Sequence, residues 1–298
     1  MQNPDPAMQA PALGTRLEGR LKRLARATRI NWPVTDQDLE SYVKQKRRAE
    51  LARWSSQSSQ GKSVTAFTDN TTANAWLSNP TILKPGRMIT ALRMRTNSCS
   101  NRVAMNRIGP VPDIDCRQCG TQLETLGHIL GMCRYTKPSR IRRHDEICDL
   151  IVQEVQKQGR EEAVTVEPPT MVAPRGGNLK PDLVIQRQGR VLVVDVTVRH
   201  EDGNNLAMGH NDKMRKYGKL LPQFRQRFGS TDAKVLPIVV GTRGAMPRKT
   251  IQGLQKLGIT TKGVYKTISL IVLRSSIEIY HDFMEYNAPL RRDARQPP

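Results

Sequence analysis

Two short apolar segments, residues 182–187 and 190–198, constrain the fold more than any other feature of this sequence. The Gln188-Gly189 pair between them is typical of a two-residue hairpin turn, so the segments are predicted to form adjacent antiparallel strands. With that turn, Asp182 and Asp195 face each other across the strand pair, with Cβ atoms about 4.5–5.5 Å apart. The second segment is apolar almost throughout, which indicates a buried central strand.

The two facing aspartates indicate a metal site. Two carboxylates at that distance repel each other, and burying both in the ionised form is costly unless a cation or a proton compensates. A divalent metal ion resolves this conflict, and the oxygen ligands of Asp182 and Asp195 favour magnesium. A magnesium ion can polarise a scissile phosphate and lower the pKa of a bound water, and a nearby lysine can stabilise the developing negative charge. The alternative is that Asp195 ends its strand and faces water.

The other elements of the second half alternate between helical and extended patterns. Apolar periodicity predicts further elements there: helices at 139–158, 210–228, 247–257 and 264–285, and a third strand at 235–240. Pro237 inside that strand indicates a sheet edge or a strand start, and the proline- and glycine-rich residues 159–178 are predicted to be a loop. Residues 139–286 are therefore predicted to form an α+β domain, a mixed sheet with flanking helices.

A cluster of cysteine and histidine residues precedes this domain. Its spacing is that of a closed tetrahedral zinc site, Cys116-x2-Cys119-x8-His128-x4-Cys133. Residues 124–131 are predicted to form a short helix that presents His128. Because four protein ligands leave no open coordination position, we expect the zinc to be structural. The alternative is that these are four ordinary loop residues.

The two remaining cysteines, Cys99 and Cys148, stand apart from the cluster, and this usage fits a reducing compartment better than a disulfide framework. Cys148 falls on the apolar stripe of the helix at 139–158 and is predicted to be a small core residue. His144 lies near the same stripe, where a packed histidine and a functional one are both consistent with the pattern.

Composition shifts divide the chain into five segments. Residues 1–14 are predicted to be disordered, and residues 15–63 are predicted to be a basic helical segment that ends in a Ser/Gln/Gly-rich linker. Within that segment, Thr35 and Asp38 are typical of a capping box. The remaining segments are the helical linker at 64–138 with its zinc knuckle at 116–133, the α+β domain, and a basic tail at 287–298.

The charge of the chain indicates a polyanionic partner. The sequence holds 48 Lys and Arg against 27 Asp and Glu, a formal net charge of +21 over 298 residues. No run of 18 apolar residues is present, and no basic stretch is followed by an apolar helix face of the kind that lies on lipid. We therefore expect a nucleic acid and not a membrane. Several arginines are candidates for phosphate contact, although they also fit an ordinary solvated face: Arg87, Arg93, Arg95, Arg102, Arg107, Arg140, Arg142 and Arg143.

Pro181-Asp182, Asp195 and a basic helix residue together resemble the P-D…(D/E)-x-K nuclease superfamily. In the common form of that pattern a lysine lies two residues after the second acid. This chain has Thr197 at that position, so the catalytic lysine must come from elsewhere.

The wider order of motifs resembles that of site-specific non-LTR retrotransposon polyproteins over roughly residues 66–285. The motifs that carry the resemblance are the cysteine cluster with His128-Ile129-Leu130, Arg143-His144-Asp145, Lys180-Pro181-Asp182, Asp195-Val196-Thr197-Val198, Lys213-x2-Lys216-Tyr217 and Gly241-Thr242-Arg243-Gly244. The resemblance implies a restriction-enzyme-like endonuclease whose catalytic lysine lies on the helix after the second acid. It therefore adds Lys213, Lys216 and Tyr217 to the two aspartates as the catalytic set.

The resemblance also implies a biological role. Such an enzyme nicks double-stranded chromosomal DNA in the nucleus, typically in large-subunit ribosomal RNA genes, and the exposed 3′-hydroxyl primes reverse transcription of the element RNA. The sequence contains no aromatic-x-Asp-Asp pair of the polymerase kind, so we expect a C-terminal portion of such a polyprotein or a truncated copy. The alternatives are a non-catalytic, zinc-containing nucleic-acid-binding protein and a structure-specific repair nuclease.

Helical periodicity predicts different directions for the side chains of Lys213 and Lys216. Lys213 lies one turn before Tyr217 on the apolar stripe of the helix, so its side chain is predicted to point towards the sheet and the aspartates. Lys216 lies about 100° around the helix from Tyr217 and is predicted to sit nearer the DNA backbone or solvent. The alternative is that both lysines extend along the helix surface.

Overall fold

The computed structural model describes residues 10–285 except residues 32, 69, 159–162, 167, 169 and 173–175. The chain divides into two units, Met1–Gln57 and Ser58–Pro298. The predicted basic tail and the first nine residues of the segment predicted to be disordered lie outside the described residues.

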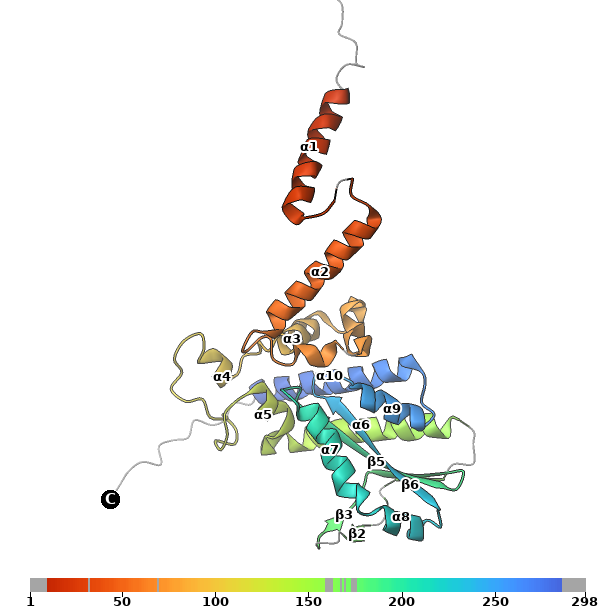
Figure 1. Cartoon of the computed structure of the whole chain (residues 1–298). Helices are drawn as coiled ribbons and strands as arrows, with labels where there is room; N and C mark the ends of the chain where they lie inside the picture. Colours follow the sequence, from red (N-terminus) through yellow and green to blue (C-terminus); the bar gives the residue numbers. More distant parts are fainter. Residues whose placement is uncertain are drawn as a thin grey trace, which may run out of the picture. The chain divides into compact units, whose positions relative to one another are not determined.

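The first unit contains helices α1 (Ala10–Thr28) and α2 (Asp36–Ser55) (Figure 1). The capping box at the start of α2 is confirmed, because Thr35 accepts a hydrogen bond from the Asp38 amide and the Asp38 carboxylate accepts one from the Thr35 amide. Since α1 already begins at Ala10, the prediction of disorder up to residue 14 is wrong for its last residues.

The second unit begins with a helical linker and continues into the α+β domain. The linker elements are η2 (Val64–Phe67), η3 (Thr71–Leu77), η4 (Pro80–Ile82), α3 (Pro85–Arg95), α4 (Arg102–Met105), α5 (Leu126–Gly131) and η5 (Arg134–Thr136). The α+β elements are α6 (Lys137–Gln156), β1 (Ala163–Val166), β2 (Met171–Val172), β3 (Asn178–Leu179), β4 (Leu183–Arg187), β5 (Arg190–Arg199), α7 (Asn205–Gly218), α8 (Leu221–Arg227), β6 (Asp232–Gly241), α9 (Arg248–Lys256) and α10 (Lys262–Glu285).

The main sheet is mixed, as predicted, with the strand order β1-β4-β5-β6. β4 pairs antiparallel with both β1 and β5, whereas β5 and β6 are parallel. β6 lies at the edge of the sheet, which agrees with the position of Pro237 in it. β2 and β3 form a separate two-stranded ribbon.

The hairpin between β4 and β5 has the predicted register. Gln188 and Gly189 both have positive φ angles, 48° and 72°, as a two-residue hairpin turn of the primed type requires. Leu183 pairs with Val194, and one further step of this antiparallel register brings Asp182 opposite Asp195.

Two predictions about the elements are wrong. Residues 159–178 were predicted to be a loop, but they include β1, which pairs with the edge of β4. The Val164-Thr165-Val166 run of β1 is too short to show the alternation of apolar and polar residues that marks a strand. The helix predicted at 210–228 is two helices, α7 and α8. Pro222 lies in the first turn of α8 and has no amide N–H with which to continue a helix from α7.

Helices cover both faces of the sheet. Buried residues of α6, α9 and α10 pack with alternate residues of the central strands, including Leu192, Val194 and Val196 of β5. The other face packs against α7 and α8 through Tyr217 and Phe224, and α7 contacts both β5 and β6 (Figure 1). The alternation of a strand therefore places Asp195 on the face that α7 covers.

The linker shares a core with the α+β domain. Trp76, Met94 and Leu130 of the linker pack with Ile277 and Phe283 of α10 in one cluster. The three cysteines of the predicted zinc site belong to the same cluster, so that site lies within the core that joins the two parts. Among the helices that the structure describes, none has both the length and the apolar character that crossing a membrane requires.

Candidate active site and metal centres

Cys116, Cys119, His128 and Cys133 come together as one buried cluster. One ligand atom from each residue lies within 4.8 Å of the other three. The sulfurs of Cys116 and Cys133 are 3.8 Å apart, which is about the separation that two thiolates have on a tetrahedral zinc ion with Zn–S bonds of about 2.3 Å. Cys119 Sγ and His128 Nε2 are 3.3 Å apart. The cluster can therefore hold a zinc ion.

The surroundings of His128 suit a metal ligand. Its Nδ1 is 2.8 Å from Gln122 Oε1, a contact that leaves Nε2 facing the cysteines. Burial lowers the pKa of His128, which favours the neutral, ligating form of the imidazole. As predicted, the histidine is presented by a short helix, α5, and the Thr125 side chain caps this helix by accepting a hydrogen bond from the His128 amide.

Glu124 supports the same module, a role that no pattern in the sequence indicated. Its side chain is fully buried and accepts hydrogen bonds from the Arg117 amide and guanidinium and from the Arg102 amide. Burial alone raises the pKa of Glu124, but the hydrogen bonds from Arg117 and Arg102 lower it overall. The carboxylate therefore holds the two ends of the Cys116–Glu124 turn together.

Both aspartates of the β4–β5 hairpin line one cavity of about 400 Å³. Lys213 and Lys216 of α7, His144 of α6 and Lys180 line it as well. The residues predicted from the hairpin and those implied by the family resemblance thus meet at one place.

Asp195 and Lys213 form the closest contact in this cavity. Asp195 Oδ2 lies 2.5 Å from Lys213 Nζ, and the two side chains are 2% and 20% exposed. This arrangement agrees with the predicted direction of Lys213 towards the sheet. It also overturns the alternative in which Asp195 faces water, because the carboxylate is buried in the central strand.

Asp182 is held from two sides. Its Oδ2 accepts a hydrogen bond from the Val196 amide at 2.7 Å and lies 3.1 Å from His144 Nε2. His144 Nδ1 is 3.0 Å from Asp145 Oδ1, so the imidazole lies between two carboxylates. The contact with Asp182 is the main cause that raises the pKa of His144, to about 11. His144 is therefore part of the site and not merely a packed histidine.

Lys216, predicted to sit nearer the DNA backbone or solvent, is half-buried and lines the cavity. Its Nζ donates to the Tyr217 hydroxyl at 2.8 Å, and that hydroxyl donates to the Lys180 carbonyl at 2.7 Å. Burial lowers the pKa of Lys216, and burial followed by the negative charge of Asp195 raises the pKa of Tyr217. Tyr217 is itself fully buried and is not among the described residues that line the cavity.

The predicted phosphate-binding arginines divide into two groups. Arg95 and Arg143 are buried, although Arg143 also lines the cavity of the two aspartates. Arg95 donates to the Asn74 side chain and the Ala73 carbonyl, and Arg143 donates to Ser276 and the Leu130 carbonyl. The others keep exposed or half-buried side chains: Arg87, Arg93, Arg102, Arg107, Arg140 and Arg142.

A second network that the sequence did not reveal surrounds Glu201. This carboxylate is 1% exposed and pairs with Arg243 Nε at 3.0 Å, while Arg243 also donates to the Met94 carbonyl of the linker. A Cβ on Gly241 would collide with the Glu201 carboxylate, and Gly244 has a φ of 87°. Gly241 of the Gly241–Gly244 motif thus leaves room for the buried ion pair between Glu201 and Arg243. Through its hydrogen bond to Met94, Arg243 also connects the linker to the end of β6.

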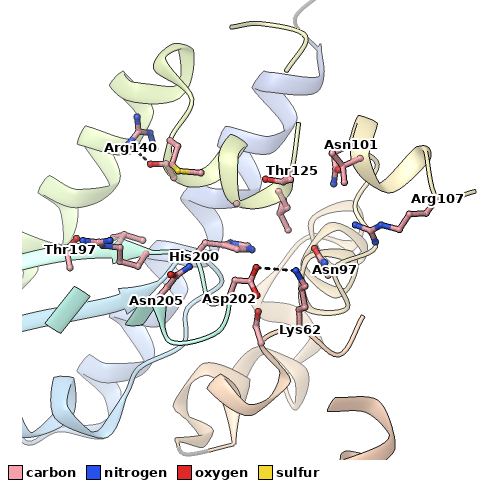
Figure 2. Close-up of a pocket in the computed structure, with 18 residues that line it drawn as sticks. Lys62, Asn97, Asn101, Arg107, Thr125, Arg140, Thr197, His200, Asp202 and Asn205 are labelled. Carbon is pink, nitrogen blue, oxygen red and sulfur yellow. Dashed lines mark hydrogen bonds and ion pairs between the residues drawn. The ribbon is translucent and has the colours of Figure 1, made fainter. Parts of the chain in front are cut away.

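Figure 2 shows a second cavity, of about 600 Å³. Arg140, Thr197 and Val198 line both cavities. Arg140 is held in place by hydrogen bonds to the Gly131 and Cys133 carbonyls, next to the cysteine cluster. The two cavities therefore meet where β5 passes the zinc module.

The second cavity has a basic lining. Figure 2 shows Lys62 and Arg107 on the side opposite Arg140, and Arg199 contributes a further cation from β5. Among the described residues that line it, Asp202 is the one acid, and it lies 3.5 Å from Lys62 Nζ. The lining thus carries a surplus of positive charge next to the aspartate pair.

Comparison with known proteins finds similarity to retrotransposon polyproteins. No family model matches it. A retrovirus-related Pol polyprotein from the type-2 retrotransposable element R2DM of Drosophila melanogaster is 26% identical over 224 residues, 74% of this chain and 21% of that relative. A Pol polyprotein from the type-1 element R2 of Popillia japonica is 30% identical over 201 residues, 66% of this chain and 40% of the relative.

A third relative, from the type-1 element R2 of Bradysia coprophila, is 29% identical over 187 residues, which are 62% of this chain and 21% of that polyprotein. The chain thus spans between 21% and 40% of the length of these curated relatives. Its homologues are R2 retrotransposon Pol polyproteins, and this similarity supports a retrotransposon-derived protein.

Proposed function

We propose that the second unit is a metal-dependent DNA endonuclease of a non-LTR retrotransposon, with a restriction-endonuclease-like fold. Its task is to nick chromosomal target DNA in the nucleus so that the new 3′-hydroxyl primes reverse transcription of the element RNA. The observation that carries the proposal is the convergence of Asp182, Asp195, Lys213 and Lys216 on one cavity. The similarity of the chain to R2 retrotransposon Pol polyproteins supports it.

The donor set of the cavity fits magnesium. Asp182 and Asp195 offer carboxylate oxygens, the hard ligands that this ion prefers. Asp195 is buried, and a buried carboxylate needs a positive charge close to it. In this structure Lys213 supplies that charge. A magnesium ion held by the two aspartates would supply polarisation of the scissile phosphate and a more acidic bound water.

The basic residues of the cavity act on the phosphate. Lys213 faces the buried carboxylate and would stabilise negative charge that develops on the phosphate during cleavage. Lys216 is oriented by the Tyr217 hydroxyl, and that hydroxyl is anchored on the Lys180 carbonyl. Tyr217 is then a positioning residue, because it is buried behind the lysines.

The DNA would extend from the cleavage cavity into the neighbouring basic one. Arg140 and Thr197 line both cavities, so a strand whose phosphate lies at Asp195 can pass them towards Lys62 and Arg107. Such cations hold a strand by its phosphates and carry no sequence information. A bound zinc ion would have a structural role here, because it would fix α5 and the carbonyls that orient Arg140.

A nicking assay tests the proposal. Supercoiled plasmid that carries a large-subunit ribosomal RNA gene is incubated with the protein, with and without magnesium, beside a plasmid without the insert. We expect magnesium-dependent relaxation, faster on the ribosomal plasmid. No nicking of either plasmid by folded protein that holds about one zinc ion per chain, in its cysteine cluster, would overturn the assignment.

A further inference from the structure

A second group of metal-ligating side chains lies beside the aspartate pair. His144 and Cys148 are one turn apart on α6, and Asp182 faces them from the residue before β4. One ligand atom from each of the three lies within 4.8 Å of the other two. His144 Nε2 is 3.1 Å from Asp182 Oδ2 and 4.0 Å from Cys148 Sγ.

We propose that His144, Cys148 and Asp182 bind a zinc ion, and that this zinc inhibits the nuclease by taking Asp182 from magnesium. The inhibition rests on the proposed endonuclease function, whereas the zinc site itself does not. It is separate from the Cys3His cluster, whose four ligands are all supplied by residues 116–133.

The ligand chemistry separates zinc from magnesium. A thiolate and an imidazole are soft ligands that suit zinc, and magnesium prefers oxygen ligands. Three protein ligands leave one of the four tetrahedral positions for water. His144 and Asp182 line the cavity of about 400 Å³, so an ion and its water can enter from solvent, while Cys148 is 8% exposed and closes the site from the helix.

The partners of His144 suit this role. Its other ring nitrogen, Nδ1, is 3.0 Å from Asp145 Oδ1. Zinc-bound histidines commonly donate their second N–H to a carboxylate, which fixes the ring and makes the ligating nitrogen more basic. On binding, the Cys148 thiol proton and the His144 Nε2 proton pass to solvent, and Asp182 Oδ2 exchanges its contact with His144 for the metal.

Sharing of Asp182 makes the two ions antagonistic. The proposed magnesium ligands are Asp182 and Asp195, and the proposed zinc ligands include the same Asp182 carboxylate. A carboxylate that already neutralises one dication attracts a second less strongly, and the two dications also repel each other. Zinc therefore raises the magnesium concentration that nicking needs.

Metal content tests the site without reference to activity. Wild-type protein, Cys148→Ala and Cys99→Ala are equilibrated with buffered zinc, desalted and analysed. Cys99 is a matched control, because it is a buried free cysteine outside both clusters. We expect about two zinc ions per chain for wild type and Cys99→Ala, and about one for Cys148→Ala. About one zinc ion in all three proteins would overturn the site.

Nicking at fixed magnesium tests the antagonism. In Cys148→Ala, the zinc concentration that halves the nicking rate should rise at least about tenfold. Loss of a direct ligand lowers the metal affinity at least as much as loss of a residue that only hydrogen-bonds to a ligand. Cys99→Ala should match wild type. If Cys148→Ala does not fold, Cys148→Ser serves in its place. Equal zinc inhibition of every variant contradicts the antagonism. A wild type that binds about two zinc ions, and that does not nick at saturating magnesium even when only the cysteine cluster holds zinc, keeps the site and refutes the proposed function.

Discussion

Asp195 Oδ2 lies 2.5 Å from Lys213 Nζ, and this contact joins the central strand β5 to helix α7 at the candidate active site. The carboxylate is buried and most of the ammonium is covered, so solvent stabilises neither charge well. Helix α7 thus supplies a lysine to the site. In the common nuclease pattern that lysine would lie on the strand, at the position that Thr197 occupies here. The half-buried Thr197 side chain lines the same cavity.

The lysines should differ in their effect on cleavage. We expect Lys213→Ala to lower the single-turnover rate about 10²–10³-fold at saturating DNA, because one positioned donor of positive charge is lost. Lys216→Ala should lose less, mainly through weaker DNA binding, and Thr197→Ala least. Normal cleavage by Lys213→Ala together with an inactive Lys216→Ala would show that the lysine roles are reversed.

The second cavity should contribute phosphate contacts. The double variant Lys62→Ala/Arg107→Ala is compared with Arg225→Ala/Arg227→Ala, a pair of exposed arginines on α8 that removes the same charge. Each lost phosphate contact should lower the slope of log affinity against log salt by about 0.9, so the first pair should lower it by up to about 1.8. Gel-shift titrations at several salt concentrations measure the slope. Equal slopes for the two pairs would place the DNA elsewhere.

Loss of zinc should loosen the core that joins the linker to the α+β domain. Cys116 and Cys133 belong to the same buried cluster as Leu130 and Phe283. Without a zinc ion to hold the cysteines together, the packing of this cluster is weaker. We expect Cys133→Ser, or chelation of wild type, to remove the structural zinc and to lower the melting temperature, followed by circular dichroism and metal analysis. A fully folded, equally stable protein without zinc would contradict the structural role.

Acid should weaken the buried pair between Glu201 and Arg243. Burial opposes ionisation of Glu201, but Arg243 and the neighbouring His200 lower its pKa overall, so the folded pKa lies below the unfolded value of about 4.3. The stabilisation is therefore present above the unfolded pKa and is lost as the pH falls through the folded one. Burial also lowers the pKa of His200, to about 4, and its protonation destabilises the fold in the same direction.

Glu201→Gln tests this pH dependence. At pH 7 the variant should be less stable than wild type by about 3 kcal/mol, because Arg243 is left buried without its partner. The difference should shrink as the pH falls from about 4 towards about 2, in urea unfolding followed by fluorescence. A difference that stays constant down to about pH 2 would mean that the ionised carboxylate contributes nothing specific.

Local patterns in the sequence were sufficient where neighbours along the chain determine the structure. The turn at Gln188-Gly189 and the strand alternation predicted the register of Asp182 and Asp195, and helical periodicity predicted the direction of Lys213. The spacing of the cysteines predicted their cluster, because a turn and one short helix position all four ligands. These features depend on residues at most 17 positions apart along the chain.

Such local patterns could not predict contacts between residues that are far apart in the sequence. Arg143 meets Ser276, and Arg243 meets the Met94 carbonyl, so both guanidinium groups are buried by segments far away in sequence. Nothing in the residues next to these arginines distinguishes them from exposed ones such as Arg142. The same holds for His144, whose approach to Asp182 depends on how α6 packs against the sheet.

The central claim is that Asp182 and Asp195 form the metal site of a DNA nuclease. The most direct measurement compares Asp182→Asn and Asp195→Asn with Asp149→Asn, an exposed aspartate of α6, in magnesium-dependent nicking and in gel-shift titration of the same DNA. We predict that the first two variants bind DNA about as well as wild type but do not cut it, because affinity comes from dispersed basic residues, and that Asp149→Asn does both. Full cutting by Asp182→Asn or Asp195→Asn would contradict the claim.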